Sequence, residues 1–187
     1  MDADLPLMEA IQAGNDAAFN ELMSRHRGPL VRFVHRYLRN DAATEDVVQE
    51  TFVRVYFKAG KFRPKSSAKT WIYSIALNLC RDQFRRLARH RGDVAMDAPT
   101  RPDAPRLEVA DLAPLPSVRA IEMDRLAHLQ RAIDELPEKL REVVLLFSLE
   151  QRSQQEVADL LGITPKAVET RVYHAKAKMR AALGMLL

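Results

Sequence analysis

Four arginines are grouped on one predicted helix of this 187-residue chain and could bind phosphate groups. Arg81, Arg85 and Arg89 recur at every fourth position, which places them on one helix face, and Arg86 lies beside them. Like charges at this spacing repel one another, so an anionic partner would compensate them. The stripe therefore indicates a surface that binds the phosphates of duplex or single-stranded nucleic acid. A solvated helix face without a partner is the alternative interpretation.

A second set of polar residues follows a glycine turn late in the chain, where residues 153–174 fit a helix-turn-helix. Ala158 is small where two helices must approach, and Gly162 stands where the turn needs a positive φ. The first turns of the second helix would enter a DNA major groove, where Arg171 could bind guanine or phosphate. The candidate contacts are Lys166, Glu169, Thr170, Arg171, His174 and Lys176. The alternative is an ordinary helical hairpin with a solvated face.

Residue types that carry out catalysis or bind metals are scattered rather than grouped. The five histidines lie far apart, and Cys80 is on a predicted helix without a neighbouring ligand set. No phosphate-binding glycine loop, nucleophile motif or metal-ligand spacing occurs. The sequence therefore predicts a binding protein that is not an enzyme, with no metal, no cofactor and no small-molecule substrate.

The composition also indicates a cellular compartment. A single cysteine cannot form an intramolecular disulfide, which favours the reducing cytoplasm. The stretch from Met1 to Asp4 is acidic, and no apolar run approaches the roughly 20 residues that a membrane span needs. We expect a cytoplasmic protein without direct membrane insertion.

The net charge of +4 averages three unlike sections. Residues 1–92 carry a net charge of +6, residues 93–125 carry −3, and residues 126–187 carry +1. Half of the ten prolines lie in the acidic middle section, and proline disfavours helix in itself and in the residue before it. Residues 93 to about 120 are therefore predicted to form an extended linker, and an inert tether is the simplest role for it.

Elsewhere the apolar residues recur at intervals of three and four, which is typical of helices. The predicted helices cover residues 5–13, 15–38, 40–59, 69–90, 121–136 and 138–149, followed by the helix-turn-helix. The second of these is predicted to be interrupted or kinked at Gly28–Pro29. The third is predicted to end in a left-handed cap at Gly60. Reciprocal hydrogen bonds between Ser153 and Glu156 are predicted to start the helix-turn-helix. The predicted fold class is all-α, with two small helical domains, 1–92 and 121–187, joined by the Pro-rich acidic linker 93–120.

Several motifs then give the chain a family resemblance. The first half contains Ala18–Leu22, Asp46–Phe52 and Thr70–Asn78, and the second half contains Leu136–Pro137, Arg141–Val143 and a helix-turn-helix that ends at Ala175–Lys178. In this order they resemble an RNA polymerase sigma factor of the sigma-70 family, extracytoplasmic-function (ECF) subfamily. Residues 10–92 look like its region 2 domain and residues 126–183 like its region 4 domain.

The resemblance implies a dissociable subunit that directs core RNA polymerase to specific promoters and helps to melt the −10 element. Region 4 would read the −35 element through the helix-turn-helix residues. Asp46, Gln49 and Glu50 match the face that docks on the clamp helices of the β′ subunit, and the β subunit is a further expected contact. Their spacing puts them on one helical face, opposite Val48 and Phe52. Capping by Asp46 on a solvated face is the alternative.

The resemblance also implies which residues recognise the −10 element. These are Lys61, Phe62, Arg63, Lys69, Trp71, Asn78, Arg81, Arg85 and Arg89. A captured base needs a pocket with an aromatic or apolar wall. Many relatives carry an aromatic just before the Thr70–Trp71 pair, where this chain has Ala68 and Lys69. Phe62, Trp71 and Tyr73 are the remaining candidates for that wall, with Trp71 as a core residue the alternative.

Further expectations concern the linker and the partners. In relatives the linker threads toward the polymerase active centre, so its acidic residues would mimic RNA. The expected partners are bacterial core RNA polymerase, promoter DNA and an anti-sigma factor. Two other functions remain as alternatives. One is a sigma mimic that sequesters an anti-sigma factor without binding DNA, and the other is a simple helix-turn-helix repressor.

Overall fold

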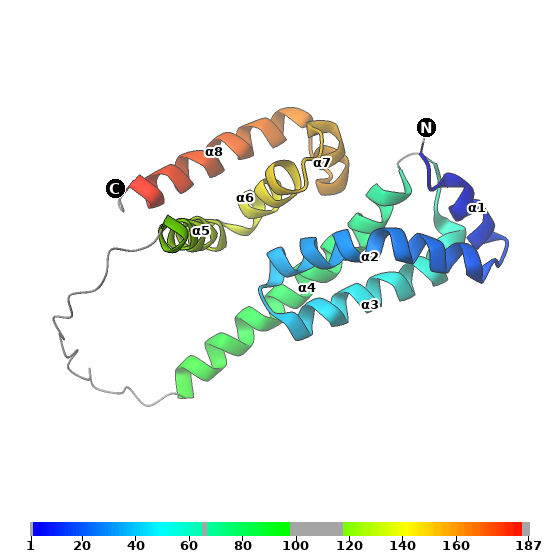
Figure 1. The fold of residues 1–187 in the computed structure, drawn as a ribbon, viewed down its shortest axis with the longest axis horizontal. Coiled ribbons are helices and arrows are strands. Elements are labelled where there is room, and N and C mark those ends of the chain that lie inside the picture. The colour runs from blue at the N-terminus through cyan, green and yellow to red at the C-terminus, as the bar shows by residue number, and fades with distance from the viewer. Residues whose placement is uncertain (1, 65–66, 98–117, 185–187) are drawn as a thin grey trace.

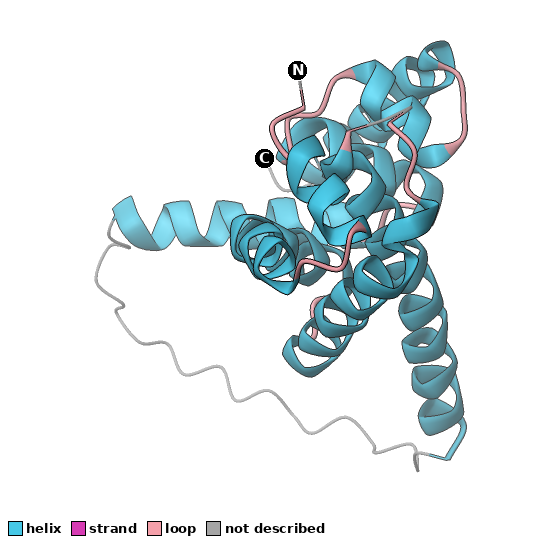
Figure 2. Ribbon diagram, turned by 90° about the vertical axis from the view of Figure 1, so that its right-hand side faces the viewer, coloured by secondary structure: helices cyan, strands magenta, loops and turns pink. Residues whose placement is uncertain are grey.

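A computed structural model of the chain describes residues 2–64, 67–97 and 118–184 (Figure 1). Within these ranges the protein contains helices and connecting loops and no strand (Figure 2). Helices α1 to α4 form one group, and α5 to α8 form a second group that lies against α2 and α4. The all-α fold class predicted from the sequence is confirmed.

The first group consists of α1 (Leu5–Gln12), α2 (Asp16–Leu38), α3 (Asp41–Lys58), the 3-10 turn η1 (Ala59–Lys61) and α4 (Ala68–Asp97). Asparagine side chains cap the first turns of two of these helices. The Asn15 side chain accepts a hydrogen bond from the backbone N–H of Ala18, and the Asn40 side chain accepts one from Ala43. Each satisfies a backbone donor that has no partner within the helix.

Of the interruption or kink predicted at Gly28–Pro29, the interruption is wrong, because α2 runs through both residues as one helix. Pro29 removes one backbone hydrogen bond. However, Leu22, Leu30 and Val34 are all fully buried along the same side of α2. Continuous burial of this apolar stripe therefore outweighs the cost of an internal proline.

The left-handed cap predicted at Gly60 is also wrong. The positive φ angles among the described glycines belong to Gly14 and Gly162, and Gly60 lies inside the 3-10 turn instead. The N–H of Phe62 donates to the carbonyl of Ala59 at 2.9 Å, and both side chains are buried. A tight turn is needed here because it returns Phe62 to the core immediately after α3.

The second group consists of α5 (Val118–Asp134), α6 (Glu138–Val143), the π-helical turn η2 (Val144–Leu149), α7 (Gln154–Leu161) and α8 (Pro165–Gly184). The helix predicted over 138–149 is thus α-helical only in its first half. After that, Glu150 donates its N–H to the carbonyl of Leu145 at 3.0 Å, which widens the turn.

Local signals of the helix-turn-helix are confirmed. Ser153 and Glu156 form both hydrogen bonds of a capping box at the start of α7. Gly162 has φ of 64°, the left-handed conformation that the turn into α8 requires. Val168 and Val172 are buried on the inner side of α8. Both helices of this motif are therefore fixed by short-range features of the sequence.

Two helices extend beyond their predicted ends. α4 continues to Asp97, past the predicted helix end at 90, and α5 begins at Val118 rather than at 121. Most of the predicted linker, residues 98–117, lies outside the described residues. Among the described helices, none is both long enough and apolar enough to cross a bilayer.

Candidate functional site

The predicted core-polymerase face lies on the outer side of α3. Asp46 and Gln49 are exposed and Glu50 is half-buried, whereas Val48 and Phe52 on the opposite side are almost fully buried. α3 therefore presents these three polar residues together, as predicted. They are placed on one surface by the burial of the apolar stripe behind them.

This acidic face continues into a groove between α3 and α4 of about 330 Å³. Asp46 and Glu50 line one wall, and Asp82 and Arg86 of α4 line the other. Glu50 accepts a hydrogen bond from Arg54 at 2.7 Å. Both charge signs therefore occur here, so a partner would need both a basic and an acidic group to match it.

An apolar groove of about 490 Å³ adjoins the same face, and sequence reasoning missed it. Gln49 lines it, so the two surfaces are continuous. Three of its side chains are unusually exposed for large apolar residues: Val53 at 47%, Tyr56 at 42% and Phe57 at 79%. The spacing of Val53 and Phe57, four residues apart and off the core stripe, was the signal that could have revealed it.

The segment between α3 and α4 carries the first of the predicted −10 residues. Lys61, Arg63 and Lys69 are exposed, so their charges are accessible. Phe62 is only 3% exposed, and its ring centroid lies 5.4 Å from that of half-buried Trp71. In this arrangement the two rings pack on each other, and the cations are the accessible part of the segment.

The predicted cation stripe of α4 is divided between two environments. Arg85 and Arg89 are exposed, and Arg85 pairs with Asp82 at 2.8 Å. Arg81 points instead to the second group of helices, where it binds Glu142. Asn78 is exposed beside it and accepts a hydrogen bond from Arg81 at 3.4 Å. Only the later part of the stripe is therefore open to solvent.

The predicted −35 residues lie on α8, which packs against α5, α6 and α7 of the second group. Five of the six are exposed and Arg171 is half-buried; the six are Lys166, Glu169, Thr170, Arg171, His174 and Lys176. Glu169 accepts a hydrogen bond from Lys166 at 2.8 Å, and Thr170 donates to the carbonyl of Lys166. The structure thus exposes five of the six on α8, whereas Arg171 lies next to the buried side of the helix.

Charged and polar side chains join the two helical groups. Arg81 donates to both carboxylate oxygens of Glu142, from Nε at 2.6 Å and from Nη2 at 2.9 Å. The Tyr37 hydroxyl donates to the same carboxylate at 3.0 Å. Arg36 pairs with Glu150 at 2.8 Å. Glu142 is 3% exposed, so its charge depends on these donors in place of water.

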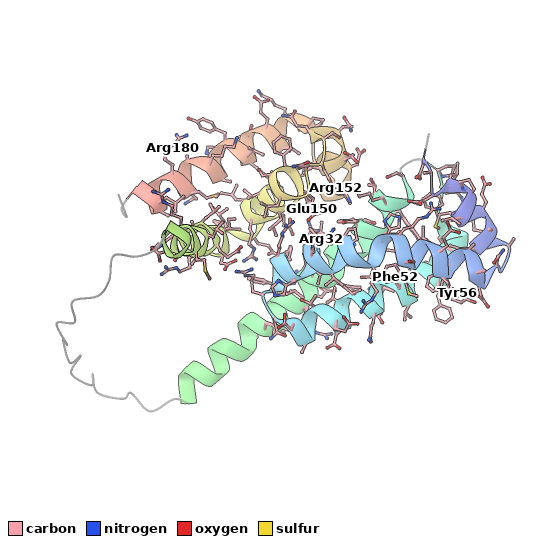
Figure 3. The ribbon with its side chains drawn as sticks, in the orientation of Figure 1. Arg32, Phe52, Tyr56, Glu150, Arg152 and Arg180 are labelled. Atoms are coloured by element: carbon pink, nitrogen blue, oxygen red, sulfur yellow. The ribbon has the colours of Figure 1, made fainter. Side chains whose placement is uncertain are left out.

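Two arginines of the second group also lie over aromatic rings of the first group. The guanidinium carbon of Arg141 lies 4.0 Å from the ring centroid of Phe84 and 5.3 Å from that of Tyr37. That of Arg152 lies 4.0 Å from the ring centroid of Tyr73. Both arginines are 4% exposed, and Arg152 stands at the boundary of the two groups (Figure 3). Desolvated contacts of this kind contribute about 2 kcal/mol each.

Hydrogen bonding alone does not satisfy these two guanidinium groups. Among the described residues, Nε and Nη2 of Arg141 and all three guanidinium nitrogens of Arg152 have no hydrogen-bond partner. An ion pair of Arg152 with Glu156, at 3.8 Å, compensates part of its charge. The negative faces of the aromatic rings therefore supply most of the electrostatic compensation.

Three groups at this boundary, Tyr37, Tyr73 and Arg81, have raised pKa values. Burial raises the pKa of Tyr37, and the neighbouring Glu142 carboxylate raises it further. Burial likewise raises the pKa of Tyr73 to about 12. The hydrogen bonds to Glu142 raise the pKa of Arg81. Both phenols stay neutral and Arg81 stays charged, which is the state that the observed contacts require.

Sequence reasoning did not find these contacts. Arg141 and Glu142 belong to a motif that it quoted, but their partners on α2 and α4 carry no sequence signal. Arg81 and Glu142 are 61 residues apart, and no local periodicity relates them. Among the described residues, no group of three or more His, Cys, Asp or Glu is placed to hold a metal ion.

Comparison with known proteins places these features in one family. The family model for sigma-70 region 2 matches residues 22–90, and the model for sigma-70 region 4 matches residues 126–179. The RNA polymerase sigma factor CnrH of Cupriavidus metallidurans is 32% identical, over 97% of this chain and 95% of that protein. An ECF RNA polymerase sigma-E factor of Haemophilus influenzae is 30% identical, over 98% of this chain and 97% of that protein.

A solved structure agrees with the sequence comparisons. The structure of CnrH in complex with the cytosolic domain of CnrY matches with a TM-score of 0.72 and 28% identity, and it covers 98% of this chain and 99% of that one. The match extends over both groups of helices. The sequence of CnrH is 32% identical to this chain, which is more than two proteins need in order to share only a fold. The chain therefore belongs to the sigma-70 family of RNA polymerase sigma factors, in its extracytoplasmic-function subfamily.

Proposed function

We propose that this sigma factor directs core RNA polymerase to its promoters by dividing three tasks among three surfaces. The outer face of α3 binds core polymerase, the first turns of α8 read the −35 element, and residues 61–71 with the exposed part of α4 engage the −10 element. The observation that carries this proposal is the helix-turn-helix geometry of α7 and α8, which exposes five of the six predicted polar residues on α8 and leaves Arg171 half-buried.

The proposed polymerase contact combines charge with apolar surface. Asp46 and Glu50 favour a basic partner helix, and the exposed side chains of Tyr56 and Phe57 offer apolar area beside them. A patch of exposed apolar side chains on an otherwise polar helix supports protein binding. We propose that the clamp helices of the β′ subunit bind the charged face first.

Promoter engagement requires the two helical groups to separate. Arg81 belongs to the proposed −10 surface, but here its guanidinium is taken up by Glu142. Tyr73, a candidate wall for a captured base, is fully buried beneath Arg152. Both residues become accessible only when the second group moves away. We propose that residues 93–120 are the connector that permits this movement between domains 1–92 and 121–187.

An anti-sigma factor is the proposed regulator. The relative CnrH was solved in complex with the cytosolic domain of CnrY. A protein that held the two groups together would keep Arg81 and Tyr73 covered, and one that occupied the α3 face would exclude polymerase. We further propose that this chain acts by binding alone, without catalysis, and that it works in the cytoplasm.

The direct test is run-off transcription with core RNA polymerase and this protein on fragments of genomic DNA. Specific transcripts that require the added protein would support the proposal. Binding to an anti-sigma factor without transcripts would indicate a sigma mimic instead. Specific binding to duplex DNA in the absence of polymerase, again without transcripts, would indicate a repressor.

A further inference from the structure

Helix α1 lies beside the segment that connects α3 to α4, and no role is assigned to it. It precedes residues 22–90, the part matched by the region 2 family model. Met8 and Ile11 bury its inner side, which packs α1 against α2 and η1. Its remaining polar side chains therefore hold fixed positions relative to that segment.

One polar side chain of α1 binds the start of the segment. Gln12 donates its side-chain amide to the carbonyl of Ala59 at 2.9 Å and to the carbonyl of Phe62 at 3.4 Å. These two carbonyls bracket the 3-10 turn, in which the N–H of Phe62 itself binds Ala59. A single amide thus joins the turn to α1 at the point where the chain leaves α3.

A second polar side chain, just before α1, binds the end of the segment. The Asp2 carboxylate accepts a hydrogen bond from the backbone N–H of Ala68 at 2.7 Å. Ala68 is the first residue of α4, where backbone N–H groups have no partner within the helix and the helix dipole favours a negative charge. The other oxygen of Asp2 accepts from the N–H of Asp4 at 3.1 Å, which orients the carboxylate.

α1 is itself tied to the long helix α2. The Asp4 carboxylate binds the ring of His26 at 2.7 Å and the guanidinium of Arg25 at 3.0 Å. The Asp4 and His26 side chains are mostly buried. The two contacts to the segment therefore start from the two ends of a stretch, Asp2 to Gln12, that Asp4 holds against α2.

We infer that Asp2 and Gln12 are positioning residues that fix the two ends of the segment proposed to engage the −10 element. This inference rests on the proposed function of that segment. Holding both ends in place keeps Lys61, Arg63 and Lys69 in a defined arrangement before DNA arrives. Cations that are positioned in advance lose less conformational entropy when they bind DNA, so promoter opening becomes faster.

The test measures promoter opening by the holoenzyme, with 2-aminopurine in the −10 element as a fluorescent probe of unpaired bases. Replacing Asp2 and Gln12 together by alanine should slow opening by about three- to tenfold, which is the loss expected for one or two hydrogen bonds. Affinity for core polymerase should stay at the wild-type value. Glu9→Gln, on the exposed side of α1, is the matched control.

A conservative substitution separates positioning from packing. Gln12→Glu keeps the size of the side chain but places a carboxylate against two carbonyl oxygens. It should slow opening at least as much as Gln12→Ala, whereas a side chain that only fills space would tolerate it. Opening at the wild-type rate by Gln12→Glu would overturn the inference.

A third variant distinguishes failure of this inference from failure of the proposed function. Lys61→Ala with Arg63→Ala removes the cations of the segment itself. If this variant opens the promoter slowly while the Asp2 and Gln12 variants open it normally, the positioning role is refuted and the role of the segment stands. If it opens the promoter at the wild-type rate, the proposed function of the segment is refuted, and the inference with it.

Discussion

Replacing Glu142 by alanine should loosen the contact between the two helical groups. This carboxylate accepts two hydrogen bonds from Arg81 and one from Tyr37, and it is 3% exposed. The substitution leaves the Arg81 guanidinium and the Tyr37 hydroxyl without their acceptor in the closed arrangement. When the groups separate, water can solvate both side chains. The open arrangement, in which the two groups are apart, therefore becomes more stable relative to the closed arrangement, in which they are in contact.

The size of the effect follows from the burial of the pair. Removing one partner of a buried, hydrogen-bonded ion pair costs about 2–5 kcal/mol. The Arg81 side chain is 28% exposed, so water recovers part of its loss and the lower half of this range applies. We expect about 2–3 kcal/mol, which shifts the ratio of closed to open protein by about 30- to 150-fold.

Energy transfer between dyes on the two groups measures this shift. Cysteines in place of exposed Lys58 and Lys178 would carry the dyes. The native Cys80 should not react, because it is fully buried and burial raises the pKa of its thiol. Glu142→Ala should lower the transfer efficiency, and Glu135→Ala, at a nearby exposed carboxylate, should leave it unchanged.

Exchanging the two charges gives a sharper criterion. The combination of Arg81→Glu with Glu142→Arg should recover part of the closed population that either change alone loses. An unchanged transfer efficiency in Glu142→Ala would refute the reasoning that this pair holds the groups together. If the double variant is as open as both single variants, the loss of the closed population does not come from the pairing of residues 81 and 142.

Three further predictions concern the separate surfaces. Arg171→Ala should weaken promoter binding by the holoenzyme about tenfold or more, the loss of about 1–3 kcal/mol for a guanine contact, while Arg180→Ala farther along the same helix should have little effect in the same gel-shift assay. Asp46→Ala with Glu50→Ala should raise the dissociation constant for core polymerase, measured by fluorescence anisotropy, and full-strength binding would contradict the assignment of the α3 face. The raised pKa of Tyr73, about 12, means that its contribution to the closed arrangement is fully present below pH 10 and is lost as the pH rises toward 12. Energy transfer should therefore be constant from pH 7 to about 9 and fall above pH 10, and Tyr73→Phe should lack this component of the fall.

The features that could be predicted from the sequence are the ones with local causes. The cap at Asn40, the capping box at Ser153 and the left-handed Gly162 each depend on residues within a few positions of one another. The exposed face of α3 and the outer face of α8 follow from helical periodicity, since burying one side of a helix fixes the direction of the other. These signals suffice to place the candidate site residues on their elements.

The features that could not be predicted depend on packing between distant segments. Pro29 remains inside α2 because the apolar residues on both sides of it are buried together. Gly60 takes part in a 3-10 turn because Phe62 returns to the core. The burial of Arg141 and the pairing of Arg81 with Glu142 arise from contact between the two groups, which helical periodicity does not encode.

Site-specific photocrosslinking tests the central claim, the division of promoter recognition between two surfaces. Photoreactive groups would replace Lys69, in the first turn of α4, and Lys176, on α8, in holoenzyme bound to its own promoter. The account predicts that position 69 crosslinks to DNA of the −10 element and position 176 to DNA of the −35 element. Crosslinks from both positions to one element, or to no promoter DNA at all, would contradict it.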